Sequence, residues 1–364
     1  MGHNKIGIVT LVENLNYGNR LQNYAVDSIY KRLGMHPVTL VNHVLPPIVK
    51  AKRIVKKMIG ISEDLPCPEK DPRFQLFEKF NEFIEFRHVY SWRGLAKEYD
   101  FFSTGSDQIW NPWYSYDLRW PFLEFAHAEK RIALAPSIGI DSIPERFVKR
   151  FRRGASGFSK LSVREYAGKK ILDSMRCPDA IVLADPTIMV QTSEWLSASS
   201  NSAVPNEPYV FVYALSAQND EHCKYFEKVA AGRKIVTLGD LKSYGGVMAG
   251  PAEFIGLIAN ADVVITDSFH GLVFSMLLDV PLTIVKRLGN GDDLSSRFDT
   301  LVYKFGLESA LYENDGEFVL DPTVKLERLN KERWQYLDYL ASYFDDDAII
   351  RLAQTLNIDW EKMK

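Results

Sequence analysis

Cysteine is scarce in this 364-residue sequence: its three cysteines, Cys67, Cys177 and Cys223, lie far apart. Three isolated cysteines exclude a disulfide framework and a zinc site built from CxxC pairs. The sequence also lacks an Asn-x-Ser/Thr acceptor, a P-loop, and the HExxH and GxSxG motifs. We therefore expect a cytoplasmic protein without a signal peptide, a metal or a cofactor.

Long apolar runs and an excess of positive charge are missing as well. The longest apolar stretch, around Leu272–Leu278, is far shorter than the roughly 20 residues that cross a membrane. Lysine and arginine number 44 against 47 aspartates and glutamates, so the formal net charge is −3. Because a general nucleic-acid-binding domain is usually basic, we expect no nucleic-acid partner.

What the sequence does contain is a regular alternation of strand-like and helical patterns. Strand-like runs occur at residues 6–10, 37–41, 99–103, 131–135, 161–164, 181–184, 209–215, 235–238, 263–266 and 282–286. Helical patterns occur at residues 20–33, 144–153, 221–231, 253–259 and 272–278. This alternation predicts an α/β protein whose parallel sheets are covered on both faces. The two successive series indicate two Rossmann-like lobes.

A segment rich in Ser, Asn and Pro, residues 197–208, separates the two series. We therefore expect a first lobe over residues 1–196, a linker over 197–208 and a second lobe over 209–323. The tail, residues 324–364, is expected to form helices that pack back on the first lobe, as happens in other two-lobed folds.

One segment of the first lobe is strongly basic. No acidic residue occurs between Asp27 and Glu63, and apolar residues recur at helical spacing over 48–59. The cations of this stretch are Lys50, Lys52, Arg53, Lys56 and Lys57. A basic amphipathic helix is typical of contact with an anionic membrane, here its inner face, or with a lipid pyrophosphate. The alternative is an ordinary solvated basic face.

The first strand-to-helix junction is rich in amides. Its polar residues are Asn14, Asn16, Tyr17, Gly18 and Asn19. Ligands of open α/β sheets bind at such junctions, and Asn side chains both donate to and accept from sugar hydroxyls. We expect Asn16, Tyr17, Gly18 and Asn19 to contact a sugar acceptor. The alternative is an Asn/Gly turn that binds nothing.

A second polar cluster follows the strand-like run that ends near Gly105. It comprises Ser106, Asp107, Gln108, Trp110 and Asn111. A carboxylate, amides and an indole together suit a sugar, and Asp107 is the candidate base for a sugar hydroxyl. The alternative places Ser106 or Asp107 at a helix cap and Trp110 in the core.

Two further positions suit an anionic ligand. Arg164 ends a short strand just before a helix, where a guanidinium suits a bidentate grip on a carboxylate or phosphate, or alternatively a salt bridge. Ser295 or Ser296 is expected to cap a helix that contains Arg297, after a Gly-Asn-Gly loop. That loop is expected to close over an anion, unless it is simply a surface loop.

The sharpest pattern is strand, tight turn and helix over residues 261–275. Asp267 and Ser268 are natural N-caps, and the N–H groups of Phe269, His270 and Gly271 are expected to point out of the helix N-terminus. A helix N-terminus binds anions, and His270 is a candidate acid or base there. A histidine with a purely structural role is the alternative.

Six motifs in order carry a family resemblance: NYGN at 16–19, GSDQIWN at 105–111, SIG at 137–139, SVRE at 162–165, DP at 185–186 and TDSFHG at 266–271. Together they resemble the polysaccharide pyruvyl transferase family over roughly residues 5–307. The resemblance implies a GT-B-like fold of two Rossmann-like lobes facing a cleft. It also implies transfer of a pyruvyl group from phosphoenolpyruvate to two hydroxyls of one sugar, often lipid-linked, of a bacterial capsule, exopolysaccharide or cell wall.

The resemblance assigns roles to several residues. Arg164 and His270 match positions that contact the donor in characterised members, and His270 is the candidate acid. The residue two before that histidine is an arginine in those members but Ser268 here. Arg297, Lys286 or Arg287 would have to replace the missing cation.

Two other functions stay open at this point. One is a GT-B glycosyltransferase that uses a nucleotide sugar, for which Asp240 and Glu253 are only loosely placed as ribose-binding carboxylates. The other is a non-catalytic protein that binds a glycan or a lipid carrier.

Overall fold

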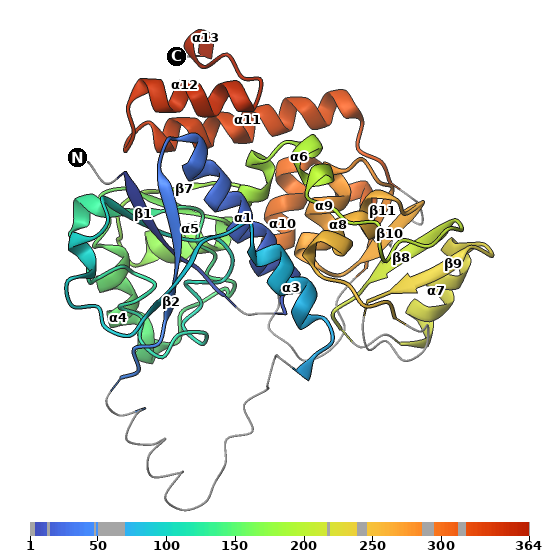
Figure 1. Ribbon diagram of the computed structural model, residues 1–364, viewed down its shortest axis with the longest axis horizontal. Helices are drawn as coiled ribbons and strands as arrows, with labels where there is room; N and C mark the ends of the chain where they lie inside the picture. The colour runs from blue at the N-terminus through green and yellow to red at the C-terminus, as the bar shows by residue number, and fades with distance from the viewer. Residues whose placement is uncertain are drawn as a thin grey trace, which may run out of the picture.

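The computed structural model describes residues 4–12, 15–46, 49, 70–216, 219–238, 246–285, 295–311 and 318–363. Its elements form two lobes of parallel strands and helices, with a layer of C-terminal helices (Figure 1). The predicted α/β fold with two lobes of parallel strands is thereby confirmed.

The first lobe contains a five-stranded parallel sheet in the order β3-β2-β1-β4-β5. Its strands are β1 (Lys5–Val9), β2 (His36–Asn42), β3 (Phe86–Val89), β4 (Phe101–Thr104) and β5 (Arg131–Ala133). The chain order reverses between β1 and β4. Ligands bind at such switch points, outside the carboxyl ends of the strands. The amide-rich junction and the polar cluster at 105–111 follow these two strands.

Helices and a small second sheet complete the first lobe. The helices are α1 (Tyr17–Arg32), α3 (Phe74–Asn81), α4 (Glu145–Ala155), α5 (Tyr166–Ser174) and α6 (Thr192–Ser197), with short 3₁₀ turns η2 (Leu95–Lys97), η3 (Ala128–Lys130) and η4 (Pro186–Met189). The small sheet pairs β6 (Leu161–Val163) with β7 (Ala180–Val182) in parallel. Ser162 joins the two sheets, because its Oγ accepts from the Ala135 N–H and donates to the Ala133 carbonyl.

The second lobe has a four-stranded parallel sheet in the order β11-β10-β8-β9. Its strands are β8 (Tyr209–Tyr213), β9 (Lys234–Thr237), β10 (Val263–Thr266) and β11 (Leu282–Ile284). Its helices are α7 (Asp220–Ala230), α8 (Pro251–Ala259), α9 (Phe269–Leu277) and α10 (Ser295–Phe305), followed by the turn η5 (Glu308–Ala310). The strand order reverses between β8 and β10, so His270 of α9 follows a switch-point strand.

The two lobes share one hydrophobic core. Tyr17 of α1 stacks on Phe254 of α8, with ring centroids 5.0 Å apart, and its hydroxyl donates to the Ala249 carbonyl at 2.9 Å. Burying apolar surface from both lobes together disfavours their separation, because separation would return that surface to water. Helix α1 therefore belongs to the first sheet by sequence and to the lobe junction by packing (Figure 1).

The C-terminal helices are α11 (Pro322–Leu340), α12 (Asp346–Thr355) and α13 (Trp360–Met363), and they lie together along the top of the molecule in Figure 1. The buried hydroxyls of Tyr336 and Tyr339 donate to the carbonyls of Ala184 and Ala133, at 2.6 and 2.7 Å. The predicted packing of the tail on the first lobe is confirmed.

Sequence patterns did not indicate α3, β3 or α6. Of the four residues of β3, only Val89 is buried, so this edge strand lacks an alternating apolar pattern. No helix within the described ranges combines the length and the apolarity that a membrane crossing requires.

The Tyr336 hydroxyl gives a test of the tail packing. Tyr336→Phe leaves the Ala184 carbonyl buried without its donor, which should lower the free energy of unfolding by about 1–2 kcal/mol. Urea unfolding measures this change. Tyr303→Phe is the control, because Tyr303 is 68% exposed and should change little. Equal stability of Tyr336→Phe and wild type would contradict the packing.

Candidate functional site

Five charged or titratable residues from five segments meet in one buried cluster where the lobes join. We call it the Arg164 cluster, and its members are Asp107, Arg164, Asp185, His270 and Arg297. Their exposed fractions are all 7% or less. Asp107 follows β4, Arg164 follows β6, Asp185 follows β7, His270 lies in α9 and Arg297 lies in α10. The carboxyl ends of parallel strands thus place Asp107, Arg164 and Asp185 next to one another, although they are far apart in the sequence.

Arg164 is the centre of this cluster. Its Nη1 donates to Asp185 Oδ2 at 2.6 Å, and its Nη2 donates to Asp107 Oδ1 at 3.1 Å. Its guanidinium carbon lies 4.5 Å from the centre of the Phe269 ring, a cation–π distance. Of the two expectations for Arg164, the structure shows the salt bridge. Its partners are two aspartates from other segments of the chain.

The neighbouring Glu165 has a different task. Its Oε1 accepts from the N–H groups of Ile138 and Gly139, at 2.7 and 3.0 Å. The same loop reaches the polar cluster, because the Ser137 N–H donates to the Asp107 carbonyl at 2.7 Å. Glu165 thus holds the loop against which the Asp107 backbone is fixed.

Asp107 has partners on both carboxylate oxygens. Oδ2 accepts from the Asn19 amide, and Oδ1 accepts from Arg164 and lies 3.6 Å from Arg297 Nη1. Burial opposes ionisation, but the charges of Arg164, His270 and Arg297 outweigh it and lower the pKa of Asp107. The backbone has φ +56° here, so no helix begins at this position.

Asp185 completes the grip on Arg164. Its Oδ1 accepts from the N–H and the hydroxyl of Thr187, at 3.1 and 2.8 Å, and thereby caps η4. Burial again opposes ionisation, but His270 and Arg164 outweigh it and hold the pKa of Asp185 well below its usual value. Asp185 was not among the candidate site residues. The sequence feature that could have pointed to it is the Asp-Pro pair at 185–186, directly after the strand-like run at 181–184.

His270 comes from the second lobe and is enclosed by the first. Its Nε2 lies 3.5 Å from Asp185 Oδ2 and has no hydrogen-bond partner among the described residues. A Cβ added to Gly18 would lie 2.0 Å from His270 Nδ1, so the first turn of α1 lies directly against the imidazole. Ser268 is the N-cap of α9, as predicted, and its Oγ accepts from the Gly271 N–H at 3.4 Å.

Arg297 connects the cluster to the Gln108 amide of the first lobe. With its amide oxygen turned to the guanidinium, Gln108 accepts from Arg297 Nη1 and Nη2 at 3.0 and 2.9 Å. Asn111 lies beside Gln108 and accepts from the Trp113 N–H at 3.1 Å. The structure thus brings Asn19, Gln108 and Arg297 together with His270.

Other predicted residues serve packing or caps. Trp110 is fully buried in the core of the first lobe, and its indole N–H donates to the Pro121 carbonyl, so the core alternative applies to it. Asn16 caps α1 by accepting from the Asn19 N–H at 3.0 Å. The Ser106 hydroxyl is buried and donates to the Ala135 carbonyl at 3.0 Å.

A further group lies close to the cluster or at its edge. Phe269 supplies the ring on which Arg164 lies. Gly271 packs so closely on Thr266 that a Cβ would lie 2.4 Å from its Oγ1. The Ser296 carbonyl accepts from the Thr300 hydroxyl, whose oxygen accepts from the Tyr166 N–H of the first lobe. Tyr17, Phe269 and Gly271 thus serve packing: Tyr17 lies on Phe254, Phe269 lies beside His270, and Gly271 lies on Thr266.

Several predictions fall outside the described residues. They concern Asn14, Asp240, Lys286, Arg287 and the basic segment with Lys50, Lys52, Arg53, Lys56 and Lys57. Glu253 is described, and it accepts from the Gly250 N–H at the start of α8 and from Ser202. Its carboxylate is thus used in helix capping.

No group of three or more His, Cys, Asp or Glu residues in the described ranges is arranged to hold a metal ion.

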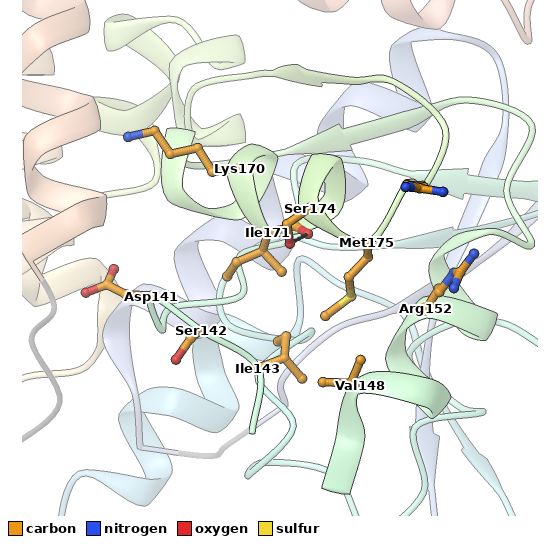
Figure 2. Close-up of a pocket in the computed structure, with 10 residues that line it drawn as sticks. Asp141, Ser142, Ile143, Val148, Arg152, Lys170, Ile171, Ser174 and Met175 are labelled. Atoms are coloured by element: carbon orange, nitrogen blue, oxygen red, sulfur yellow. Dashed lines mark hydrogen bonds between the residues drawn. The ribbon is translucent and has the colours of Figure 1, made fainter. Parts of the chain in front are cut away.

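A surface hollow of about 580 Å³ lies on the first lobe between α4 and α5 (Figure 2). Its lining includes Asp141, Arg152 and Lys170 and no member of the Arg164 cluster.

Comparison with known families identifies the chain. The model of the polysaccharide pyruvyl transferase family matches residues 16–287, which is most of the chain and includes all but Arg297 of the Arg164 cluster. The chain belongs to the polysaccharide pyruvyl transferase family. The resemblance carried by the six motifs is thereby confirmed, and the pyruvyl transferase match ends just beyond β11.

Solved structures similar to this pyruvyl transferase family member include an epimerase and a glycosyltransferase. UDP-GlcNAc 2-epimerase from Methanocaldococcus jannaschii is 14% identical, with 90% of this chain and 91% of that chain covered and a TM-score of 0.44. The glycosyltransferase SnogD from Streptomyces nogalater is 14% identical, with 98% and 99% covered and a TM-score of 0.44. A search of curated proteins gives no significant match.

The ionised state of Asp107 can be tested through stability. Asp107→Asn leaves Arg164 and Arg297 with one anion fewer, which should lower the free energy of unfolding by about 3–5 kcal/mol at neutral pH. Because folding lowers the pKa of Asp107 below its ordinary 3.8, this stabilisation is complete above pH 3.8. It is lost as the pH falls through the lower folded value.

The difference between wild type and Asp107→Asn should therefore narrow below pH 3.8. Urea unfolding at neutral pH and at steps below 3.8 measures it. Asp141→Asn, at an exposed carboxylate, is the matched control and should show no such gap. A constant gap across the range would mean that Asp107 is not ionised in the folded chain.

Proposed function

We propose that the protein transfers a pyruvyl group from phosphoenolpyruvate to two hydroxyls of one sugar, forming a cyclic ketal on a bacterial polysaccharide precursor. The observation that carries the proposal is His270. Its Nε2 is buried, lies 3.5 Å from Asp185 Oδ2 and has no hydrogen-bond partner among the described residues. A positioned imidazole beside fixed cations is what protonation of an anionic enol phosphate requires.

His270 is the proposed acid. Its protonated imidazole gives a proton to the methylene carbon of phosphoenolpyruvate while the first sugar hydroxyl bonds to the neighbouring carbon. The proton of that hydroxyl passes to the phosphate, which then leaves. The second hydroxyl attacks the same carbon, and its proton restores His270, so protons and bonds balance with no further reactant.

The donor site needs more positive charge than the cluster supplies. Arg164 and Arg297 are balanced by Asp107 and Asp185, whereas the donor carries both a phosphate and a carboxylate. We propose that protonated His270, the N–H groups at the start of α9 and the cations Lys286 and Arg287 supply the rest. Ser268, in the place of the family's arginine, uses its side chain to cap α9 instead.

Asp107 suits a different role from the base predicted for it. A lowered pKa makes a carboxylate a weaker proton acceptor, and both oxygens of Asp107 already have partners. We propose that it orients Arg164, Arg297 and Asn19 around the reacting groups. The amides of Asn19, Gln108 and Asn111 are the proposed contacts of the sugar acceptor.

The proposed acceptor is a sugar on a lipid carrier, and the protein is proposed to work in the cytoplasm at the inner face of the membrane. The basic segment with Lys50, Lys52, Arg53, Lys56 and Lys57 is the sequence feature that supports this location. Its contact with an anionic membrane stays a prediction.

Donor identity can be tested by thermal unfolding with candidate donors. A ligand that binds only the folded chain raises its melting temperature. Phosphoenolpyruvate should raise it more than the same concentration of inorganic phosphate, and Arg297→Gln should abolish the difference. Lys224→Gln, an exposed change on α7, should keep it. Stabilisation by UDP- or GDP-sugars alone would instead favour a nucleotide-sugar glycosyltransferase.

The role of His270 can be tested in turnover. His270→Gln should lower the release of phosphate from phosphoenolpyruvate, with a panel of free and lipid-linked sugars, by about 10²-fold or more. Exposed His127→Gln is the matched control and should keep the wild-type rate. An unchanged rate in His270→Gln would remove this histidine from the acid role.

A further inference from the structure

The edge of the first lobe that carries the Arg164 cluster also carries an exposed aromatic loop. Trp113, Tyr114 and Tyr116 follow the polar cluster at 105–111 and are 52%, 53% and 71% exposed. Three large aromatic side chains on one short loop are unusual on a surface that faces only water. Trp and Tyr are the side chains that favour the boundary between water and lipid headgroups.

Helix α4 lies against this loop and is strongly basic. Arg146 lies over the Trp113 ring, with its guanidinium carbon 4.3 Å from the ring centre, and Phe147 packs edge-on against the same ring at 5.4 Å. The eleven residues of α4 contain one acid, Glu145, and five cations: Arg146, Lys149, Arg150, Arg152 and Arg153. Glu124, outside the helix, pairs with Arg150 and lies 4.0 Å from Arg153, so the cations remain in excess.

The cations of α4 share one side of the helix. Phe151, Gly154 and Ala155 are its buried residues, and helical periodicity places all five cations on the remaining arc. The hollow between α4 and α5 is lined by Arg152 and Lys170 and by one acid, Asp141 (Figure 2). Arg176 also lines it, so the hollow extends the positive charge. The chain as a whole has a net charge of −3, so this basic surface is local.

The topology of the first sheet places this basic and aromatic surface beside the Arg164 cluster. The strands of the first sheet are parallel, so the loops after β4 and β5 lie at the same carboxyl edge. The first loop carries Asp107 and then Trp113, and the second leads into α4. The aromatic loop and the start of α4 therefore flank the edge that holds the Arg164 cluster.

We propose that this surface, which we call the α4 surface, docks on a membrane rich in anionic lipids, with Trp113, Tyr114 and Tyr116 in the headgroup layer and the α4 cations against the lipid phosphates. Two contributions favour membrane binding: the attraction of the cations to anionic headgroups, and the preference of the exposed aromatic side chains for the boundary between water and lipid. Docking itself is independent of the donor chemistry. That it presents a lipid-linked sugar to the cluster rests on the proposed function.

Vesicle co-sedimentation of the full chain tests the docking, without donor or acceptor. Wild type should bind phosphatidylcholine vesicles that contain phosphatidylglycerol and should not bind pure phosphatidylcholine. Lys149→Gln with Arg153→Gln should weaken binding about 30-fold, because each cation near an anionic surface contributes a factor of about five. Trp113→Ala with Tyr116→Ala should also weaken binding.

Matched controls separate this surface from general charge effects. Lys224→Gln with Lys331→Gln removes the same charge from exposed positions on α7 and α11 and should leave binding unchanged. The proposal would be overturned if wild type did not bind anionic vesicles, or if the double variant of α4 bound them as tightly as wild type. It would also be overturned if the α4 double variant and the control double variant lost the same amount of vesicle binding. Tighter binding to a single-stranded oligonucleotide than to vesicles would overturn it in favour of nucleic acid. None of these outcomes bears on phosphoenolpyruvate, whose role the thermal measurements decide separately.

Discussion

The double ion pair of Arg164 with Asp107 and Asp185 is the interaction on which the rest of the site depends. Its three members follow β4, β6 and β7, so the pair ties the large sheet of the first lobe to the small one. A buried ion pair is costly unless its geometry is good and its other polar atoms are satisfied. Here Asn19 and Thr187 supply the remaining partners of the carboxylates.

That arrangement also defines what the chemistry has to work with. The two carboxylates hold the cations in place and at the same time cancel their charge. The proposed anionic donor would therefore draw further positive charge from the start of α9, the imidazole of His270 and the cations Lys286 and Arg287.

Local signals in the sequence were sufficient for much of the fold. Val263–Thr266 has the predicted bounds, because a buried parallel strand leaves a continuous apolar run. Ser268 was also predictable, as a helix cap, because a cap depends only on its own side chain and on the first turn of the helix. The partners of Arg164 were not predictable, because they lie 57 and 21 residues away in other segments. Trp110 was misplaced toward a ligand, since its neighbours in sequence are polar while its side chain faces Phe122 and Phe158.

The contact between Gly18 and His270 makes the candidate site depend on how the two lobes are held together. The imidazole belongs to the second lobe, while the glycine against it and the aspartate 3.5 Å from it belong to the first. Rotation of one lobe away from the other would remove the histidine from both supports at once. The Arg164 cluster is thus complete only while the two lobes stay in contact, so a substitution that loosens the packing of Tyr17 on Phe254 would also displace His270 from Asp185.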